Sequence, residues 1–243
     1  MIFVGLSAVT FDFAKGLPME RLIPSESFRL LIAGLIFAAS GSMVAILPLG
    51  KLSGGHINPA VSLAFWAQGK MDGHDLGGYI IGQFLGAFVG AVFLVLVWGD
   101  YAASVNNGMT LPGDGYSLWD VFLAEVGMTF LLVFSIFVFV SSHRLMRWTP
   151  LMAWLLITAM VWWGAPISGT SINPACSIGS ALISWNWQAQ WLYCIAPILG
   201  AMLAVVIYRF LSINRCKIIT GKLFYVSHYR CIFKNVYVSQ HKI

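Results

Sequence analysis

The chain has 243 residues, of which 59% are hydrophobic and only 9% are charged. A soluble domain carries roughly a quarter charged residues, so this composition excludes a soluble domain and indicates a membrane protein. The formal net charge of +5 does not indicate binding to nucleic acid, because the basic residues gather in connecting segments and in the C-terminal tail. The four cysteines have neither metal-binding spacing nor a paired framework, and we expect no metal and no cofactor.

The first half of the chain contains three apolar runs and one shorter helix. Residues 1–13 are apolar apart from Asp12, but at about 1.5 Å per residue they cover only roughly 20 Å of a hydrocarbon core of about 30 Å. We therefore expect the first transmembrane helix to be truncated. Residues 30–50 and 76–99 are free of charge, and each run is long enough for one span. Between them, residues 61–68 predict a helix too short to cross the membrane alone.

The second half repeats this order. Residues 118–142 predict a span that carries Glu125, and residues 148–208 then contain no charged residue and no histidine. Within that stretch we expect a span, a short helix and a last span over residues 149–166, 176–184 and 188–210. The predicted organisation is therefore a first repeat, a linker, a second repeat and a basic tail over residues 1–99, 100–117, 118–211 and 212–243.

One octapeptide occurs in both halves. Ser53-Gly-Gly-His-Ile-Asn-Pro-Ala60 and Ser168-Gly-Thr-Ser-Ile-Asn-Pro-Ala175 are identical at six of eight positions. Proline suits the first turn of a helix, where its missing N–H would have had no partner, and asparagine before it is a good N-cap. Each copy therefore predicts a loop that enters a short helix.

The order of span, span, half-helix and span, given twice, predicts an inverted repeat. An odd number of crossings per repeat gives the two halves opposite orientations, an architecture known in membrane proteins. Irregular backbone at membrane depth is tolerated only inside protein or beside a water-filled cavity, so we expect both octapeptides to be re-entrant and to line a path. The fold class is thus an all-α membrane protein with six transmembrane helices, the first truncated, and two re-entrant half-helices.

The basic residues predict the orientation. With both termini inside, 11 of the 14 Lys and Arg residues fall on the inner side, and only Lys15, Arg21 and Arg29 lie in outer loops. Basic residues favour the cytoplasmic side. We expect a multi-pass protein of the cell membrane with both termini in the cytoplasm.

Two half-helices that enter from opposite faces meet N-terminus to N-terminus near the middle of the membrane. Each N-terminus carries about half a unit of positive charge, and the amides of Asn58 and Asn173 add two donors. Such a centre favours a dipolar solute that accepts hydrogen bonds, repels cations and interrupts a proton-conducting chain of water.

The paired motifs, the half-helix arrangement and the closing segment Gln190-Trp-Leu-Tyr-Cys-Ile-Ala-Pro-Ile-Leu-Gly-Ala are similar to the aquaporin/glyceroporin channels, the major intrinsic protein family. The resemblance covers roughly residues 1–211. It implies six spans, one pore in each protomer, a homotetramer in the lipid bilayer, and water or small neutral solutes as the molecules that pass. The motif residues it implies at the pore are Asn58, Pro59, Ala60, Asn173, Pro174 and Ala175.

The resemblance also implies a selectivity filter, and here the chain departs from the family. Cys176 stands where the family usually has arginine, and the other ring positions are Ala38, Val161 and Thr170. We expect a wider and less polar filter that passes small uncharged solutes with water, and a Cys176 that faces the pore. A shift of one residue would put Phe37 in place of Ala38 and narrow the pore again.

Other positions leave the substrate open. Ser177, Ala181 and Tyr193 resemble the water channels, so both a water channel and a wider glycerol facilitator remain, as does a non-conducting truncated member of the family. The resemblance gives Glu125 the role of bracing the second loop through backbone N–H groups, with no counterpart in the first span. For His56 we expect a structural hydrogen-bonding role, and the alternative is a pH gate.

Other protein classes fit less well. An enzyme is not expected, since the apolar segments hold no acid pair, no Ser/His/Asp set and no metal-spaced cluster. A secondary transporter would need intramembrane charges for ion coupling, and residues 148–208 have none. The tail is either a binder of anionic lipid headgroups or unselected sequence.

Overall fold

The computed structural model of the chain describes residues 1–211 and 217–226, and its regular secondary structure there is entirely helical. The longer helices are α1 (Ile2–Phe13), α3 (Glu26–Ile46), α5 (Pro59–Ala67), α6 (Gly73–Trp98), α8 (Leu118–Val140), α9 (Thr149–Ser168), α10 (Pro174–Ser184) and α11 (Gln190–Leu211). The short ones are α2 (Met19–Leu22), α4 (Pro48–Ser53), α7 (Asp100–Ser104) and the 3-10 turns η1 (Asn106–Gly108) and η2 (Met146–Trp148). Of the predicted tail, residues 212–216 and 227–243 lie outside the described residues.

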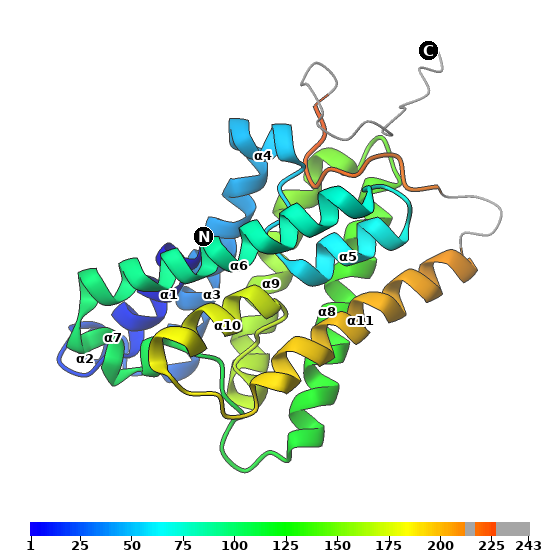
Figure 1. The fold of residues 1–243 in the computed structure, drawn as a ribbon. Helices are drawn as coiled ribbons and strands as arrows, with labels where there is room; N and C mark the ends of the chain where they lie inside the picture. Colours follow the sequence, from blue (N-terminus) through cyan, green and yellow to red (C-terminus); the bar gives the residue numbers. More distant parts are fainter. Residues whose placement is uncertain (212–216, 227–243) are drawn as a thin grey trace.

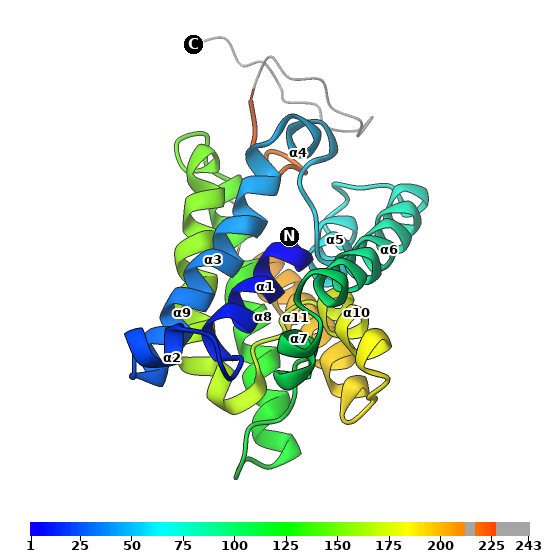
Figure 2. The ribbon, with the colours of Figure 1, turned by 90° about the vertical axis from the view of Figure 1, so that its left-hand side faces the viewer.

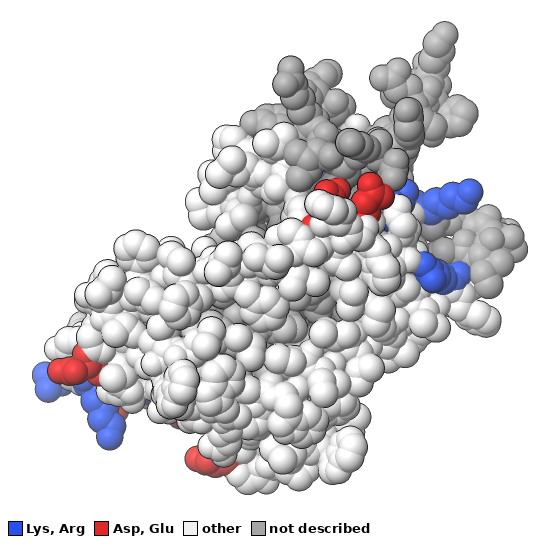
Figure 3. Space-filling model, viewed as in Figure 1, with Lys and Arg blue, Asp and Glu red and all other residues white. Residues whose placement is uncertain are grey.

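Five helices of the described chain are long and apolar enough to cross a membrane, namely α3, α6, α8, α9 with its preceding turn, and α11. The apolar helix α1 has only 12 residues, as expected for a short first span. On the face that Figure 3 shows, the charged side chains lie toward the two ends of the molecule, and a broad area without them lies between. The chain is a multi-pass membrane protein, and the predicted all-α fold with five full spans and one short one is confirmed.

Several predicted boundaries were wrong. Residues 30–50 do not form one helix, because α3 ends at Ile46 and a separate helix begins at Pro48. Proline lacks an N–H and forces the preceding residue out of the helical region, and Leu47 is accordingly extended, with ψ of 158°. The two short helices begin at the motif prolines, two residues before the predicted starts. The predicted linker contains α7 and η1.

The helix contacts follow the inverted repeat. Helix α3 packs against its counterpart α9, the pair α1–α6 matches the pair α8–α11, and α1–α3 matches α8–α9. Each short helix packs on the last span of the other half, α5 on α11 and α10 on α6. The two halves are therefore interleaved, with α10 beside α6 and α5 beside α11 (Figures 1 and 2), and most residues of both short helices are buried.

An aromatic cluster holds α5 in this position. The ring of Phe65 on α5 meets Phe137 on α8 edge-on, with centroids 5.6 Å apart. Phe137 in turn meets Tyr208 on α11 at 5.3 Å. Phe65 and Phe137 have no exposed surface, and inside a membrane such rings stabilise the contact between helices through close van der Waals packing. A helix too short to span the membrane is thus fixed by packing on two full spans.

Helices α8 and α11 touch through a glycine, which yields a test of this packing. A Cβ at Gly200 would lie 2.3 Å from the carbonyl oxygen of Val126, a backbone atom that cannot move aside alone. We expect Gly200→Ala to force the pair apart, to destabilise by roughly 1–3 kcal/mol and to lower the thermal unfolding midpoint in detergent. The control is Gly127→Ala on α8, where a Cβ meets no atom within 4 Å. Equal midpoints for the two variants would contradict the close α8–α11 contact.

Candidate functional site

The two octapeptides form two matching helix starts. Asn58 caps α5, and its Oδ1 accepts a hydrogen bond from the N–H of Ala60 at 2.9 Å. Asn173 caps α10 in the same way, with Ala175 as donor at 3.2 Å. Both asparagines are extended and both prolines occupy the first helical turn, so the local structure is what these residues favour.

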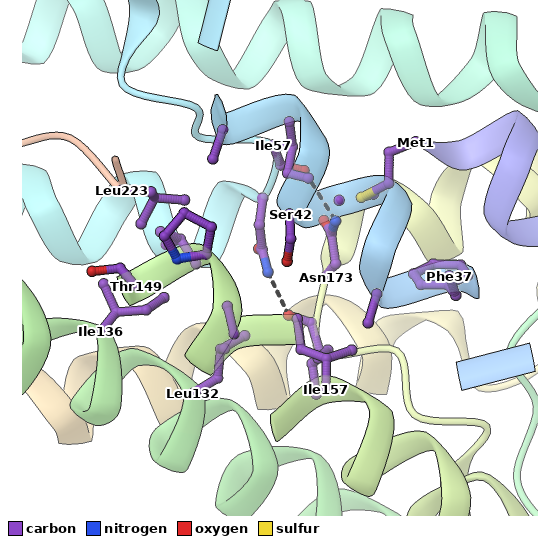
Figure 4. A pocket seen from close by; sticks show the side chains of 18 of the residues that line it. Met1, Phe37, Ser42, Ile57, Leu132, Ile136, Thr149, Ile157, Asn173 and Leu223 are labelled. Atoms are coloured by element: carbon purple, nitrogen blue, oxygen red, sulfur yellow. Dashed lines mark hydrogen bonds between the residues drawn. The ribbon is translucent and has the colours of Figure 1, made fainter. Parts of the chain in front are cut away.

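The asparagine side chains also join the two loops to each other. The Nδ2 of Asn58 donates to the carbonyl of Ile172 at 2.7 Å, and the Nδ2 of Asn173 donates to the carbonyl of Ile57 at 3.0 Å (Figure 4). Asn58 is 6% exposed and Asn173 is 7% exposed. The two helix starts are therefore side by side, and each asparagine uses its oxygen on its own helix and one amide hydrogen on the other loop.

A buried carboxylate braces the second loop. Glu125 on α8 has no exposed surface and accepts hydrogen bonds from the N–H groups of Ser171 and Ile172, both at 2.8 Å. Its Oε1 also accepts from the hydroxyl of Ser168 at 2.7 Å. A buried charge needs such partners, because transfer of an unpaired carboxylate from water is costly.

The same loop contains two residues with positive φ, a backbone conformation that residues other than glycine rarely adopt. Thr170 has φ of 50° and Ile172 has φ of 43°, and positive φ at a branched residue costs on the order of 1–3 kcal/mol. At the position equivalent to Thr170 the first loop has Gly55, with φ of 75°, where the cost is absent. The three hydrogen bonds to Glu125 offset this strain in the second loop.

An amide, rather than a carboxylate, braces the first loop. Gln83 on α6 donates through Nε2 to the carbonyl of His56 at 3.0 Å and to the hydroxyl of Ser62 at 2.9 Å. This role of Gln83 was not predicted from the sequence, although a lone amide in an otherwise apolar span was a usable signal. His56 is 5% exposed, and its ring stacks on Phe65 at 4.6 Å and meets Tyr79 edge-on at 5.9 Å.

A cavity of about 80 Å³ lies at the meeting point of the loops. Both asparagines line it, and its walls are otherwise mostly apolar, with Leu132, Ile136 and Ile157 among them (Figure 4). This volume suits a few water molecules, each of which takes about 30 Å³ of the liquid. It is well below the roughly 300–1,000 Å³ of sites for larger organic ligands.

The predicted filter residues lie at different places around this centre. Ala38 lines the cavity together with Phe37, so both alternatives for this ring position face it. Val161 packs against Gly34 on α3, and the hydroxyl of Thr170 donates to the carbonyl of Met160 at 3.2 Å.

Cys176 lies elsewhere. It is 5% exposed and packs in an apolar cluster with residues of α1 and α6, and it is not among the residues that line the 80 Å³ cavity. The motif residues Pro59, Ala60, Pro174 and Ala175 are all buried at the starts of α5 and α10.

Comparisons with known proteins agree on one family. The sequence model described as major intrinsic protein matches residues 1–208. The chain is 34% identical over 228 residues to aquaporin Z of Rhodopseudomonas palustris, covering 90% of this chain and 94% of that protein. It is 36% identical over 186 residues to aquaporin AqpM of Methanothermobacter marburgensis, covering 72% of this chain and 74% of that protein. It is 34% identical over 187 residues to the probable aquaporin TIP1-1 of Oryza sativa subsp. japonica, covering 76% and 73%.

A solved structure shares the fold. The X-ray structure of the aquaglyceroporin from Plasmodium falciparum aligns with a TM-score of 0.70, covering 85% of this chain and 89% of that chain. The sequence identity is 21%, so this likeness concerns the fold alone.

Glu125 offers a first test of the site. In Glu125→Gln one acceptor oxygen becomes an NH₂ group that cannot accept from the loop, and we expect a loss of roughly 1–3 kcal/mol because a buried donor of the loop is left without an acceptor. The readout is the thermal unfolding midpoint in detergent. Asp114→Asn makes the same change from acid to amide in an exposed turn outside the helices and should leave the midpoint close to the native value. A native-like midpoint for Glu125→Gln would show that the bracing bonds contribute little.

The reciprocal asparagine bonds offer a second test. Asn58→Ala and Asn173→Ala each remove a cap and one bond between the loops, and each should cost roughly 1–3 kcal/mol. Because both bonds join the same two loops, we expect the double variant to lose less than the sum, with a coupling of roughly 0.5–3 kcal/mol. Asn186→Ala, which removes only an exposed turn contact, serves as the additive control. Additive losses for Asn58 and Asn173 would show that the loops are independent.

Proposed function

The chain belongs to the major intrinsic protein family, and from that premise we propose that it is a passive transmembrane channel for water and small uncharged solutes. It is not an enzyme, since the members of this family are channels. The observation that carries the proposal is the pair of asparagine amides that line one small cavity from two opposed helix starts. The relatives named aquaporin support the same substrate class.

The selectivity follows from the second hydrogen of each asparagine NH₂ group, which makes no bond to the opposite loop. Each NH₂ group has two hydrogens, and one is committed to the opposite loop. The other is available to a solute oxygen in the cavity. Apolar walls offer such a molecule no competing partner, so its oxygen turns toward the asparagines and its hydrogens point away. A central molecule held in that orientation cannot relay a proton, and the two positive helix ends repel cations.

The surroundings of the channel are part of the proposal. Residues 1–99 and 118–211 form the two repeats, residues 100–117 the linker, and residues 212–243 a basic tail. The clustering of basic residues supports a cell-membrane protein with both termini in the cytoplasm. The likeness to the family supports a homotetramer with one pore in each protomer.

The filter decides between water and larger solutes. We place it at Ala38, Val161, Thr170 and Cys176, and Cys176 stands at the position where the family usually has arginine. A filter without arginine favours passage of glycerol-sized neutral molecules as well as water, and charge exclusion then depends on the helix ends. The competing function is a water channel narrowed by Phe37, which also faces the cavity.

Flux through reconstituted protein tests the proposal. In proteoliposomes we expect water and glycerol permeability well above that of empty vesicles, and proton flux at the background level. Ala38→Leu should reduce glycerol flux by about tenfold, which corresponds to a barrier increase of about 1.4 kcal/mol, and should reduce water flux less. Ala39→Leu, at a neighbouring position that does not line the cavity, is the matched control. Fast water flux with complete rejection of glycerol by the native protein would refute the wide filter.

A further inference from the structure

The segment of residues 217–226 returns to the helical bundle after α11, and its middle part is buried there without forming a helix or a strand. Ile218 is 5% exposed, Lys222 is 1% exposed and Thr220 has no exposed surface. A basic tail that only followed the last span would stay in water, because a lysine is almost never fully buried without a partner. The burial therefore indicates a specific docking site on the bundle.

Backbone hydrogen bonds fix where the segment docks. The N–H of Ile219 donates to the carbonyl of Val140 at the end of α8, at 3.1 Å, and the N–H of Leu223 donates to the carbonyl of Gly54 at 2.9 Å. Gly54 belongs to the loop that leads to Asn58, and the backbone of Gly221 lies beside the His56 ring of the same loop. The segment thus crosses from the end of α8 to the loop of the first motif (Figure 1).

Contacts among Lys222, Lys51 and Phe224, which we call the clasp, hold the segment against α4. The ammonium of Lys222 donates to the carbonyl of Lys51, in the last turn of α4, at 2.6 Å. Carbonyl groups at a helix end lack intrahelical partners and carry partial negative charge, so a cation is favourable there. The Lys51 ammonium in turn lies 5.7 Å from the centre of the Phe224 ring, a cation–π distance.

Leu223, which lies between Lys222 and Phe224 in the chain, lines the cavity. Leu223 lines the same cavity as Asn58 and Asn173, and it lies on the opposite side of that cavity from Phe37 and Met1 (Figure 4). Thr149 and Pro150, at the start of α9, also line the cavity. An apolar side chain there offers no hydrogen bond to a column of water and occupies the space through which it would leave.

We propose that residues 217–226 are an autoinhibitory plug, in which Leu223 closes the mouth of the pore beside α4 and the Lys222–Lys51–Phe224 clasp holds it there. The inference rests on the proposed channel function and adds a closed state to it. In the orientation given above, this mouth faces the cytoplasm.

The docking is opposed by like charges, which keeps the plug releasable. Burial lowers the pKa of Lys70, and the nearby charge of Lys217 lowers it further. Lys217 is exposed at the start of the docked segment. The repulsion between Lys217 and Lys70 therefore acts at the end of the segment that would detach from the bundle.

The test is the osmotic water permeability of the full chain in proteoliposomes, normalised to the amount of reconstituted protein. Lys222→Ala removes a hydrogen bond to a charged group, and Leu223→Ala removes the obstruction, so each should raise the permeability by about tenfold. Val226→Ala changes an apolar residue of the same segment that does not line the cavity, and it should conduct like the native chain. Hydrogen exchange of residues 217–226 should be slow in the native chain and fast in Lys222→Ala.

The outcomes separate the plug from the channel. Native-like permeability and slow exchange in Lys222→Ala, with a conducting native chain, would overturn the plug and leave the channel intact. Permeability equal to that of empty vesicles in the native chain and both variants would overturn the channel, and the plug with it. A rise in Val226→Ala equal to that in Leu223→Ala would also overturn the plug, because loosening of the tail by any substitution would then explain the effect.

Discussion

The structure depends on the reciprocal hydrogen bonds between Asn58 and Asn173 and the two loops that carry them. The oxygen of each side chain accepts a hydrogen bond from the first turn of its own helix, and the nitrogen donates one to the other loop. An amide is the side chain suited to this double task, because it presents an acceptor and a donor together and carries no charge to desolvate. Two short helices that cannot span a membrane alone are thereby joined into one continuous crossing.

The rest of the fold holds these loops in place by two different means. The second loop is strained at Thr170 and Ile172 and is held by the buried carboxylate of Glu125. The first loop has glycine at the equivalent of Thr170, and a neutral amide from Gln83 suffices there. The inverted repeat is therefore symmetric in its helix packing and asymmetric in the chemistry that supports its two motifs.

The sequence predicted the features that depend on local preference or on hydrophobic length. The apolar runs predicted the spans, and the Asn-Pro pairs predicted two helix starts, because capping acts over a few residues. The break at Pro48 was predictable from the same rules and was missed. The link from Asn58 to Ile172, the brace at Gln83 and the docking of residues 217–226 join residues distant in the chain. No local preference predicts such contacts, since they depend on which helices pack together.

The central claim is that each motif asparagine bonds to the loop of the other repeat. Solid-state NMR of the full chain in lipid bilayers, with ¹⁵N-labelled asparagine side chains and ¹³C-labelled isoleucine carbonyls, measures this contact directly. The structure predicts a through-space correlation between the Asn58 Nδ2 and the Ile172 carbonyl carbon, and another between the Asn173 Nδ2 and the Ile57 carbonyl carbon. Correlations confined to atoms within each loop, with neither cross-loop pair, would contradict the claim.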